Sequence, residues 1–140
     1  MIKERLDKIC EVKIKYQDKE VMVKALIDSG NLLKDPISGL PVIIVEKEKL
    51  IGLVDNLVLE NITNILKGKW IEKNCSDNKS NFILIPFRTL GNDHGMLIGF
   101  RPDNIQLHIN DDYLQKDAVV GIYLGNLSGK SNEYHAIIGL

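Results

Sequence analysis

The stretch VMVKALIDSGNLLKDP, residues 21–36, decides how this chain is interpreted. An apolar run leads directly into Asp28, Ser29 and Gly30. The simplest interpretation is a buried β-strand followed by an ordinary turn, since Asp, Ser, Gly and Asn are common turn residues. A carboxylate at the end of a buried strand also suits one half of a catalytic pair.

An aspartic protease needs two carboxylates about one water molecule apart. They share one proton, because like charges at that distance cannot both ionise. One then acts as base on the water and the other as acid toward the peptide carbonyl. A strand can deliver Asp28, the hydroxyl of Ser29 can bond across to the partner loop, and Gly30 lets backbone N–H groups approach. The triplet alone is weak, because chance places one in roughly one chain of this length in twenty.

A second apolar run, AVVGIYLG at residues 118–125, strengthens this hypothesis. In an acid-protease lobe, two apolar residues and a glycine form a strand that threads beneath the catalytic loop. We therefore expect Val119, Val120 and Gly121 under the loop, although VVG alone also fits a core strand with a bulge. The sequence holds one Asp-Ser/Thr-Gly triplet, so a second copy must supply the other carboxylate across a two-fold axis.

The composition is typical of one soluble globular domain. The chain has 140 residues, of which 44% are apolar and 26% are charged. Its net charge of −1 gives no electrostatic basis for binding nucleic acid or an anionic membrane. No window approaches the roughly 18 apolar residues of a membrane span, and the start MIKERLDKICEV lacks the apolar core of a signal peptide.

We expect neither a metal site nor a cofactor. Cys10 and Cys75 form no C-x-x-C pair, and the three histidines complete no metal-binding spacing. Both cysteines are assigned a structural or incidental role, since a reducing cytoplasm disfavours a disulfide. A serine or cysteine hydrolase is a poor alternative, because Cys75 lies in a polar loop and no G-x-S-x-G turn is present.

The hydrophobic pattern predicts a mainly β chain. Residues 12–16 and 20–27 alternate and predict a hairpin joined at Gln17-Asp18-Lys19. Pro86 indicates an edge strand or a bulge. Further strands are expected in these runs: LPVIIVEK, FILIPF, GMLIGF, NIQLHI, AVVGIYLG and YHAIIGL. At this size a closed barrel or a sandwich is the natural architecture, because closure removes exposed strand edges.

One helical insert interrupts the strands. Between Glu46 and Lys67, apolar residues recur three and four positions apart, which predicts one or two helices. Asp55 is a candidate N-cap, and Gly68 is the expected stop.

Beyond these patterns, ALIDSGNLLKDPISGLPVIIVE, residues 25–46, closely resembles the protease domain of the sporulation sigma-E factor processing peptidases of spore-forming Firmicutes. That family has an apolar strand, D-[ST]-G-N, D-P and P-V-x-V-E, and here Ser29 replaces the commoner Thr. LIPFRTLGNDHGMLIGFRPD and the final LSGKSNEYHAIIGL resemble two further family stretches. The matching motifs include Asp28 to Asn31, Asp35-Pro36, Pro41 to Glu46, Ile85 to Arg88, Gly91, Gly95 and Phe100 to Asp103.

The resemblance implies a retropepsin-like aspartic protease domain at residues 12–140, after a linker-like segment at residues 1–11. Asp28 would be catalytic, and Ser29, Gly30 and Asn31 would support its loop. Members of the family are tethered to the sporulation septum by an N-terminal multi-span region, with the protease domain in the mother-cell cytoplasm. They cleave the pro-sequence from the sigma-E precursor after a signal from the forespore. We expect this chain to be an excised C-terminal domain rather than a relative that lost its anchor.

The function of the domain and the position of its flap each have alternatives. The alternative function is a non-catalytic β-barrel module for binding or dimerisation, which would have no need of Asp28. The flap over the site has three candidates: the region after Lys49, the loop at residues 72–81 and the RTLGNDHG turn.

Three other residues have competing interpretations. His94 either touches substrate or is an exposed turn histidine. Arg88 either pairs with an acid beneath the site, such as Asp35, or is a surface charge. Asp35 itself is not expected to complete a dyad with Asp28 in one chain, because Asp in a Lys-Asp-Pro turn commonly bonds its own backbone.

Overall fold

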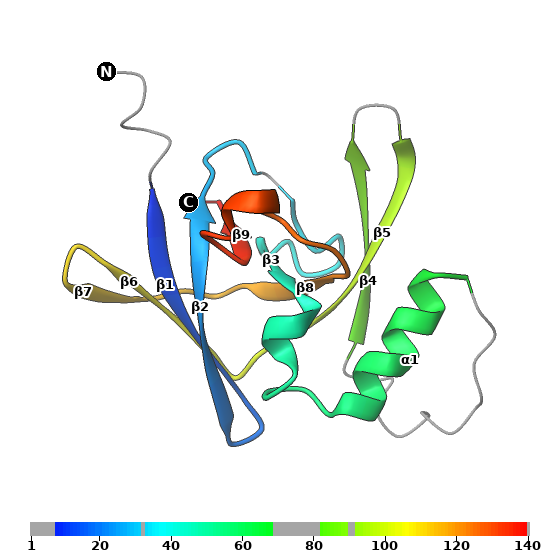
Figure 1. The fold of residues 1–140 in the computed structure, drawn as a ribbon, viewed down its shortest axis with the longest axis horizontal. Helices are drawn as coiled ribbons and strands as arrows, with labels where there is room; N and C mark the ends of the chain where they lie inside the picture. Colours follow the sequence, from blue (N-terminus) through cyan, green and yellow to red (C-terminus); the bar gives the residue numbers. More distant parts are fainter. Residues whose placement is uncertain (1–7, 32, 69–81, 90–91, 140) are drawn as a thin grey trace.

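Most of the chain folds around one mixed β-sheet (Figure 1). The computed structural model describes residues 8–31, 33–68, 82–89 and 92–139, without the side chains of residues 88, 89 and 92–94. The strands lie in the order β4-β5-β8-β3-β9-β2-β1-β6-β7. Their bounds are β1 (Ile9–Tyr16), β2 (Lys19–Ile27), β3 (Val42–Glu46), β4 (Phe82–Thr89), β5 (Asn92–Phe100), β6 (Asn104–Ile109), β7 (Asp112–Gln115), β8 (Val119–Tyr123) and β9 (Ala136–Ile138).

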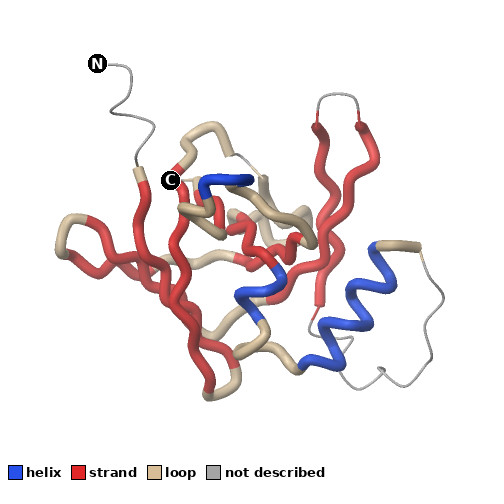
Figure 2. Tube along the Cα trace, in the orientation of Figure 1, coloured by secondary structure: helices blue, strands red, loops and turns tan. Residues whose placement is uncertain are grey.

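The prediction of a mainly β chain with a helical insert is confirmed, as Figure 2 shows. The closed barrel is not formed, because the edge strands β4 and β7 do not pair within the described ranges. Both edges are protected in other ways. Pro86 in β4 removes a backbone donor, and β7 is a short strand whose four residues are all exposed. Such features blunt a free edge, so the sheet does not need to close.

Two hairpins are joined by the same kind of tight turn. Gln17 and Asp18, between β1 and β2, have φ values of 50° and 68°, and Asn110 and Asp111, between β6 and β7, have values of 52° and 68°. Positive φ at both central residues defines a type I′ turn, whose twist matches that of the flanking strands. The first hairpin is as predicted, but β1 begins at Ile9, within the segment expected to be a linker.

The helical insert consists of the 3-10 helix η2 (Lys47–Leu50) and the helix α1 (Asn56–Leu66). Asp55 caps α1 by accepting the N–H of Leu57 at 3.0 Å, as predicted. Gly68 follows the helix with a φ of 75°, the left-handed conformation that glycine adopts without strain. Three apolar side chains anchor α1 in the core: Val58, Leu59 and Ile62.

Apolar clusters cover both faces of the sheet. Val120 belongs to the larger cluster, whereas its neighbour Val119 belongs to a second cluster with Val42, Ile85 and Leu97. The split arises because successive side chains of a strand point to opposite faces. Each fully buried side chain of this size contributes roughly 1.5–3 kcal/mol to folding.

No helix in the described part of the chain is long and apolar enough to span a membrane.

Candidate active site at the end of strand β2

Asp28 is the first residue after β2. Its N–H donates to the carbonyl of Ile138 at 2.8 Å, which ties the strand end to β9. The turn then closes on itself, since the carbonyl of Asp28 accepts the N–H of Asn31 at 3.0 Å. The side chain of Asp28 is exposed, and its Oδ1 accepts the N–H of Gly30 at 2.9 Å. The result is an accessible carboxylate with a fixed orientation.

Two glycines allow this close arrangement. A Cβ at Gly30 would lie 3.3 Å from Asp28 Oδ1, so a side chain there would crowd the carboxylate. A Cβ at Gly139 would lie 2.3 Å from the carbonyl oxygen of Asn31. The backbone after β9 therefore passes directly against the loop that carries Asp28. We did not predict this contact, and the glycine in the run YHAIIGL was the signal for it.

The other two loop residues differ in their surroundings. Ser29 is exposed, and no hydrogen bond from its hydroxyl is found within the described residues. Asn31 is half-buried, and its Oδ1 accepts the N–H of Leu33 at 3.3 Å. Its Nδ2 is buried without a partner in the described part of the chain. Ser29 is thus accessible to another molecule.

Strand β8 lies farther from Asp28 than β9 does. Across the sheet, Leu26 of β2 aligns with Ile137 of β9, which aligns with Ile44 of β3 and then with Gly121 of β8. Val119, Val120 and Gly121 are all buried. Val119 lies in the second cluster, against which Leu33 and Leu40 of the long loop also pack. The later part of the loop therefore packs against the cluster that contains Val119, whereas the part that carries Asp28 is bonded to β9.

Hydrogen bonds from its own turn hold the carboxylate of Asp35. Its buried carboxylate accepts the hydroxyl of Ser38 at 2.6 Å and the N–H groups of Ile37 and Ser38, both at 3.2 Å. The Ser38 hydroxyl, together with these N–H groups and the charge of Arg101, holds the pKa of Asp35 below its ordinary value, against the opposing effect of burial. Asp35 is therefore a structural carboxylate, as expected from the turn sequence.

The remaining candidates lie partly outside the described structure. The side chains of Arg88 and His94 and the whole loop at residues 72–81 belong to the parts that the structure does not describe. The region after Lys49 forms the end of η2 and then α1. The β4–β5 hairpin extends toward the same end of the molecule as the turn that follows β2 (Figure 1).

Cys10 packs as an apolar residue. Its thiol is buried in the larger cluster, and burial, with a smaller contribution from Glu11, raises its pKa. A raised pKa disfavours the reactive thiolate. Cys75 lies outside the described residues. No cluster of three or more potential metal-ligating residues is found in the part of the chain that the structure describes.

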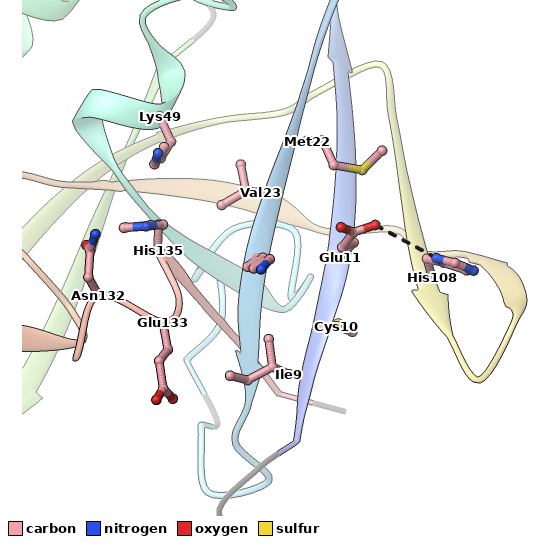
Figure 3. Close-up of a pocket in the computed structure, with 11 residues that line it drawn as sticks. Ile9, Cys10, Glu11, Met22, Val23, Lys49, His108, Asn132, Glu133 and His135 are labelled. Carbon is pink, nitrogen blue, oxygen red and sulfur yellow. Dashed lines mark ion pairs between the residues drawn. The ribbon is translucent and has the colours of Figure 1, made fainter.

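A groove of about 850 Å³ is lined by residues of β1 and β2 together with Lys49, His108 and the segment before β9 (Figure 3). Its lining mixes charges, since Glu11 and Glu133 lie in it together with Lys24 and Lys49. His135 also lines it, and Asp28 does not. The groove therefore has no single charge preference and is separate from the catalytic candidate.

Comparison with known protein families identifies the family of this chain. A model of the peptidase family described as sporulation factor SpoIIGA matches residues 2–139. The chain belongs to this family. No solved structure gives a significant match.

Relatives in the family carry names that describe peptidases. A protein of Bacillus thuringiensis subsp. kurstaki, provisionally named a sporulation sigma factor-processing peptidase, is 31% identical over 133 residues, which cover 94% of this chain and 82% of the relative. Sporulation sigma-E factor-processing peptidases of Bacillus subtilis and Priestia megaterium are 32% and 28% identical, over 83% and 94% of this chain. The matched region spans only 38% and 43% of those two proteins.

Proposed function

We propose that the chain is an aspartic endopeptidase domain with a retropepsin-like lobe, whose active site is completed by a second copy. The observation that carries this proposal is the exposed carboxylate of Asp28. The Gly30 N–H orients it at 2.9 Å, and the bond from the Asp28 N–H to Ile138 fixes its backbone. Membership in a peptidase family supports a hydrolytic role.

In this mechanism the two Asp28 carboxylates face each other and share one proton. The ionised carboxylate removes a proton from a water molecule, whose oxygen attacks the peptide carbonyl carbon. The protonated carboxyl gives its proton to the carbonyl oxygen, which yields a neutral tetrahedral diol. The carboxyl that took the proton from water then gives it to the amide nitrogen, while the other carboxylate removes a hydroxyl proton from the diol. The C–N bond breaks, an acid and an amine are released, and the pair again holds one proton.

The neighbouring residues take supporting roles. The exposed hydroxyl of Ser29 is available to bond the partner's loop, and Gly30 and Asn31 hold the turn. Val119, Val120 and Gly121 form the strand under the loop, a role supported by the packing of Val119 in the cluster that Leu33 joins.

The substrate that fits this family is the sigma-E precursor, because the relatives are named for processing sigma-E factor. We propose that the chain removes the precursor's pro-sequence, and that a forespore-derived protein activates it. The full-length protein would then act at the sporulation septum, with this domain on the mother-cell side. These steps rest on the names of relatives and on the resemblance of the motifs.

The test is cleavage of a purified sigma-E precursor by the Asp28→Asn chain. We expect at least a roughly 100-fold loss of rate, the lower range for removing a general acid–base group, with an unchanged circular dichroism spectrum. Asp112→Asn, on the exposed strand β7, is the matched control and should cleave normally. Ser29→Thr should retain activity, and Ser29→Ala should weaken the dimer. Cleavage that persists in a folded Asp28→Asn chain would contradict the aspartic mechanism.

A further inference from the structure

We propose that Glu46 and His135 are positioning residues that set the place of Asp28 through strand β9. This inference rests on the proposed function of Asp28. Glu46 is a buried carboxylate at the end of β3. Its Oε1 lies 3.0 Å from Nδ1 of His135, and its Oε2 accepts the N–H of Leu127 at 2.8 Å. The carboxylate of Glu46 thus contacts both Leu127 and His135, two residues of the segment that leads into β9.

The backbone of His135 is held on both sides as well. Its N–H donates to the carbonyl of Lys24 in β2 at 2.8 Å, and its carbonyl accepts the N–H of Glu46 in β3 at 3.0 Å. His135 is therefore the residue at which β9 enters between its two neighbours. In Figure 3 its ring lies at the side of the groove, between Lys49 and Asn132.

Strand β9 is short, so the side-chain bonds of Glu46 add to a small number of backbone pairs. It contains three residues, with three aligned pairs to β2 and two to β3. A strand of this length has few ladder bonds of its own, and each contributes modestly to stability. The side-chain bonds of Glu46 therefore add to the backbone pairing and to the burial of Ala136 and Ile138 in holding β9.

The far end of β9 contacts the catalytic turn. The carbonyl of Ile138 accepts the Asp28 N–H at 2.8 Å, and Gly139 lies directly against the backbone of Asn31. A shift of β9 would break the hydrogen bond between Asp28 and Ile138 and would bring Gly139 into collision with the backbone of Asn31. The path from Glu46 to Asp28 therefore runs through one short strand held by bonds at both ends.

Packing alone does not explain a buried glutamate at this position. Replacing a buried ion pair with apolar side chains of similar volume is often neutral or stabilising. A carboxylate that accepts from two defined donors instead fixes a geometry, since both bonds constrain direction as well as distance. The pair of Glu46 and His135 therefore acts in positioning.

The experiment measures amide hydrogen exchange at Asp28 together with precursor cleavage. His135→Ala should speed exchange of the Asp28 N–H by about fivefold to tenfold, the equivalent of losing one hydrogen bond, while exchange of Val12 in β1 stays unchanged. It should lower kcat with little change in KM. His135→Asn keeps a donor near the position of Nδ1 and should restore both values.

The matched control is His108→Ala. His108 faces Glu11 at 3.9 Å on the exposed side of the sheet and does not contact β9, so its loss should change neither readout. Unchanged Asp28 exchange in a folded His135→Ala chain, or failure of His135→Asn to restore it, would overturn the proposal. Exchange does not depend on catalysis, so an inactive wild-type chain would contradict the proposed function and still leave this test decisive.

Discussion

The carboxylates of Asp28 and Asp35 lie in the same loop but have opposite environments. Asp28 is exposed, and its Oδ1 accepts one N–H group from the turn, that of Gly30. Asp35 is buried and accepts three hydrogen bonds from Ile37 and Ser38. A carboxylate that is already saturated by local donors cannot also exchange protons with a water molecule and a substrate. The surroundings, rather than the residue type, make Asp28 and not Asp35 the candidate for the proposed chemistry.

Asp35 should make the stability of the chain sensitive to acid. Its pKa in the folded state is below the ordinary value of 3.8. The stabilisation is therefore fully present above the unfolded pKa and is lost as the pH falls through the folded pKa. Asp35→Ala should lower the free energy of unfolding by about 1–3 kcal/mol at neutral pH, because buried donors lose their acceptor. Urea unfolding at several pH values checks this.

The difference between wild type and Asp35→Ala should shrink as the pH falls below about 4, where the carboxylate of the unfolded chain is protonated first and that of the folded chain follows at lower pH. The exposed Asp112→Ala serves as the control and should show a small difference at every pH. A constant difference across the acid range would mean that the charge of Asp35 does not stabilise the turn.

The local sequence was sufficient to predict the surroundings of some site residues but not of others. The place of Asp28 at a strand end and the self-contained turn of Asp35 both follow from the residues around them. The pair of Glu46 and His135 could not be predicted, because the two residues are 89 positions apart. Only the folded sheet brings β3 and the segment before β9 together, and no periodicity encodes that contact.

Among the elements, α1 offers a clean test of helix capping. Asp55→Ala should lower the free energy of unfolding by about 1 kcal/mol, because the N–H of Leu57 loses its acceptor. Asp55→Ser should retain most of the stability, since serine also caps. Glu48→Ala, in the neighbouring 3-10 helix, is an exposed control that should have little effect. Thermal unfolding measures all three, and equal stability of Asp55→Ala and wild type would contradict the capping role.

One physical reason explains the strand and the strand ends that were not predicted from the sequence. All four residues of β7 are exposed, so no apolar alternation marks it, and the backbone turn at Asn110 and Asp111 creates the hairpin. The strands β4 and β5 extend into the polar stretch RTLGNDHG because backbone pairing does not require apolar side chains. The apolar run of β9 was visible, but its insertion between β2 and β3 depends on the whole sheet.

At the scale of the whole molecule, the sheet brings together the two ends of the described chain. Strand β9 lies between β2 and β3, where it supports the Asp28 turn with one bond and the Gly139 contact. The Asp28 turn of one lobe therefore presents one exposed carboxylate, that of Asp28. The proposed chemistry needs two, so the arrangement predicts how activity depends on the number of chains that meet.

Activity should rise with the square of chain concentration when the protein is dilute. The active species is the dimer in the proposed mechanism, and its amount follows the square of the monomer concentration well below the dissociation constant. Initial cleavage rates over a dilution series should therefore give a log–log slope of about 2, as mass action requires for an obligate dimer. Excess Asp28→Ala chain should suppress the wild type, because mixed dimers hold one Asp28 carboxylate. An excess of the Asp112→Ala chain is the control and should not suppress cleavage. A single-chain site predicts a linear dependence and no suppression, and that result would exclude the shared dyad.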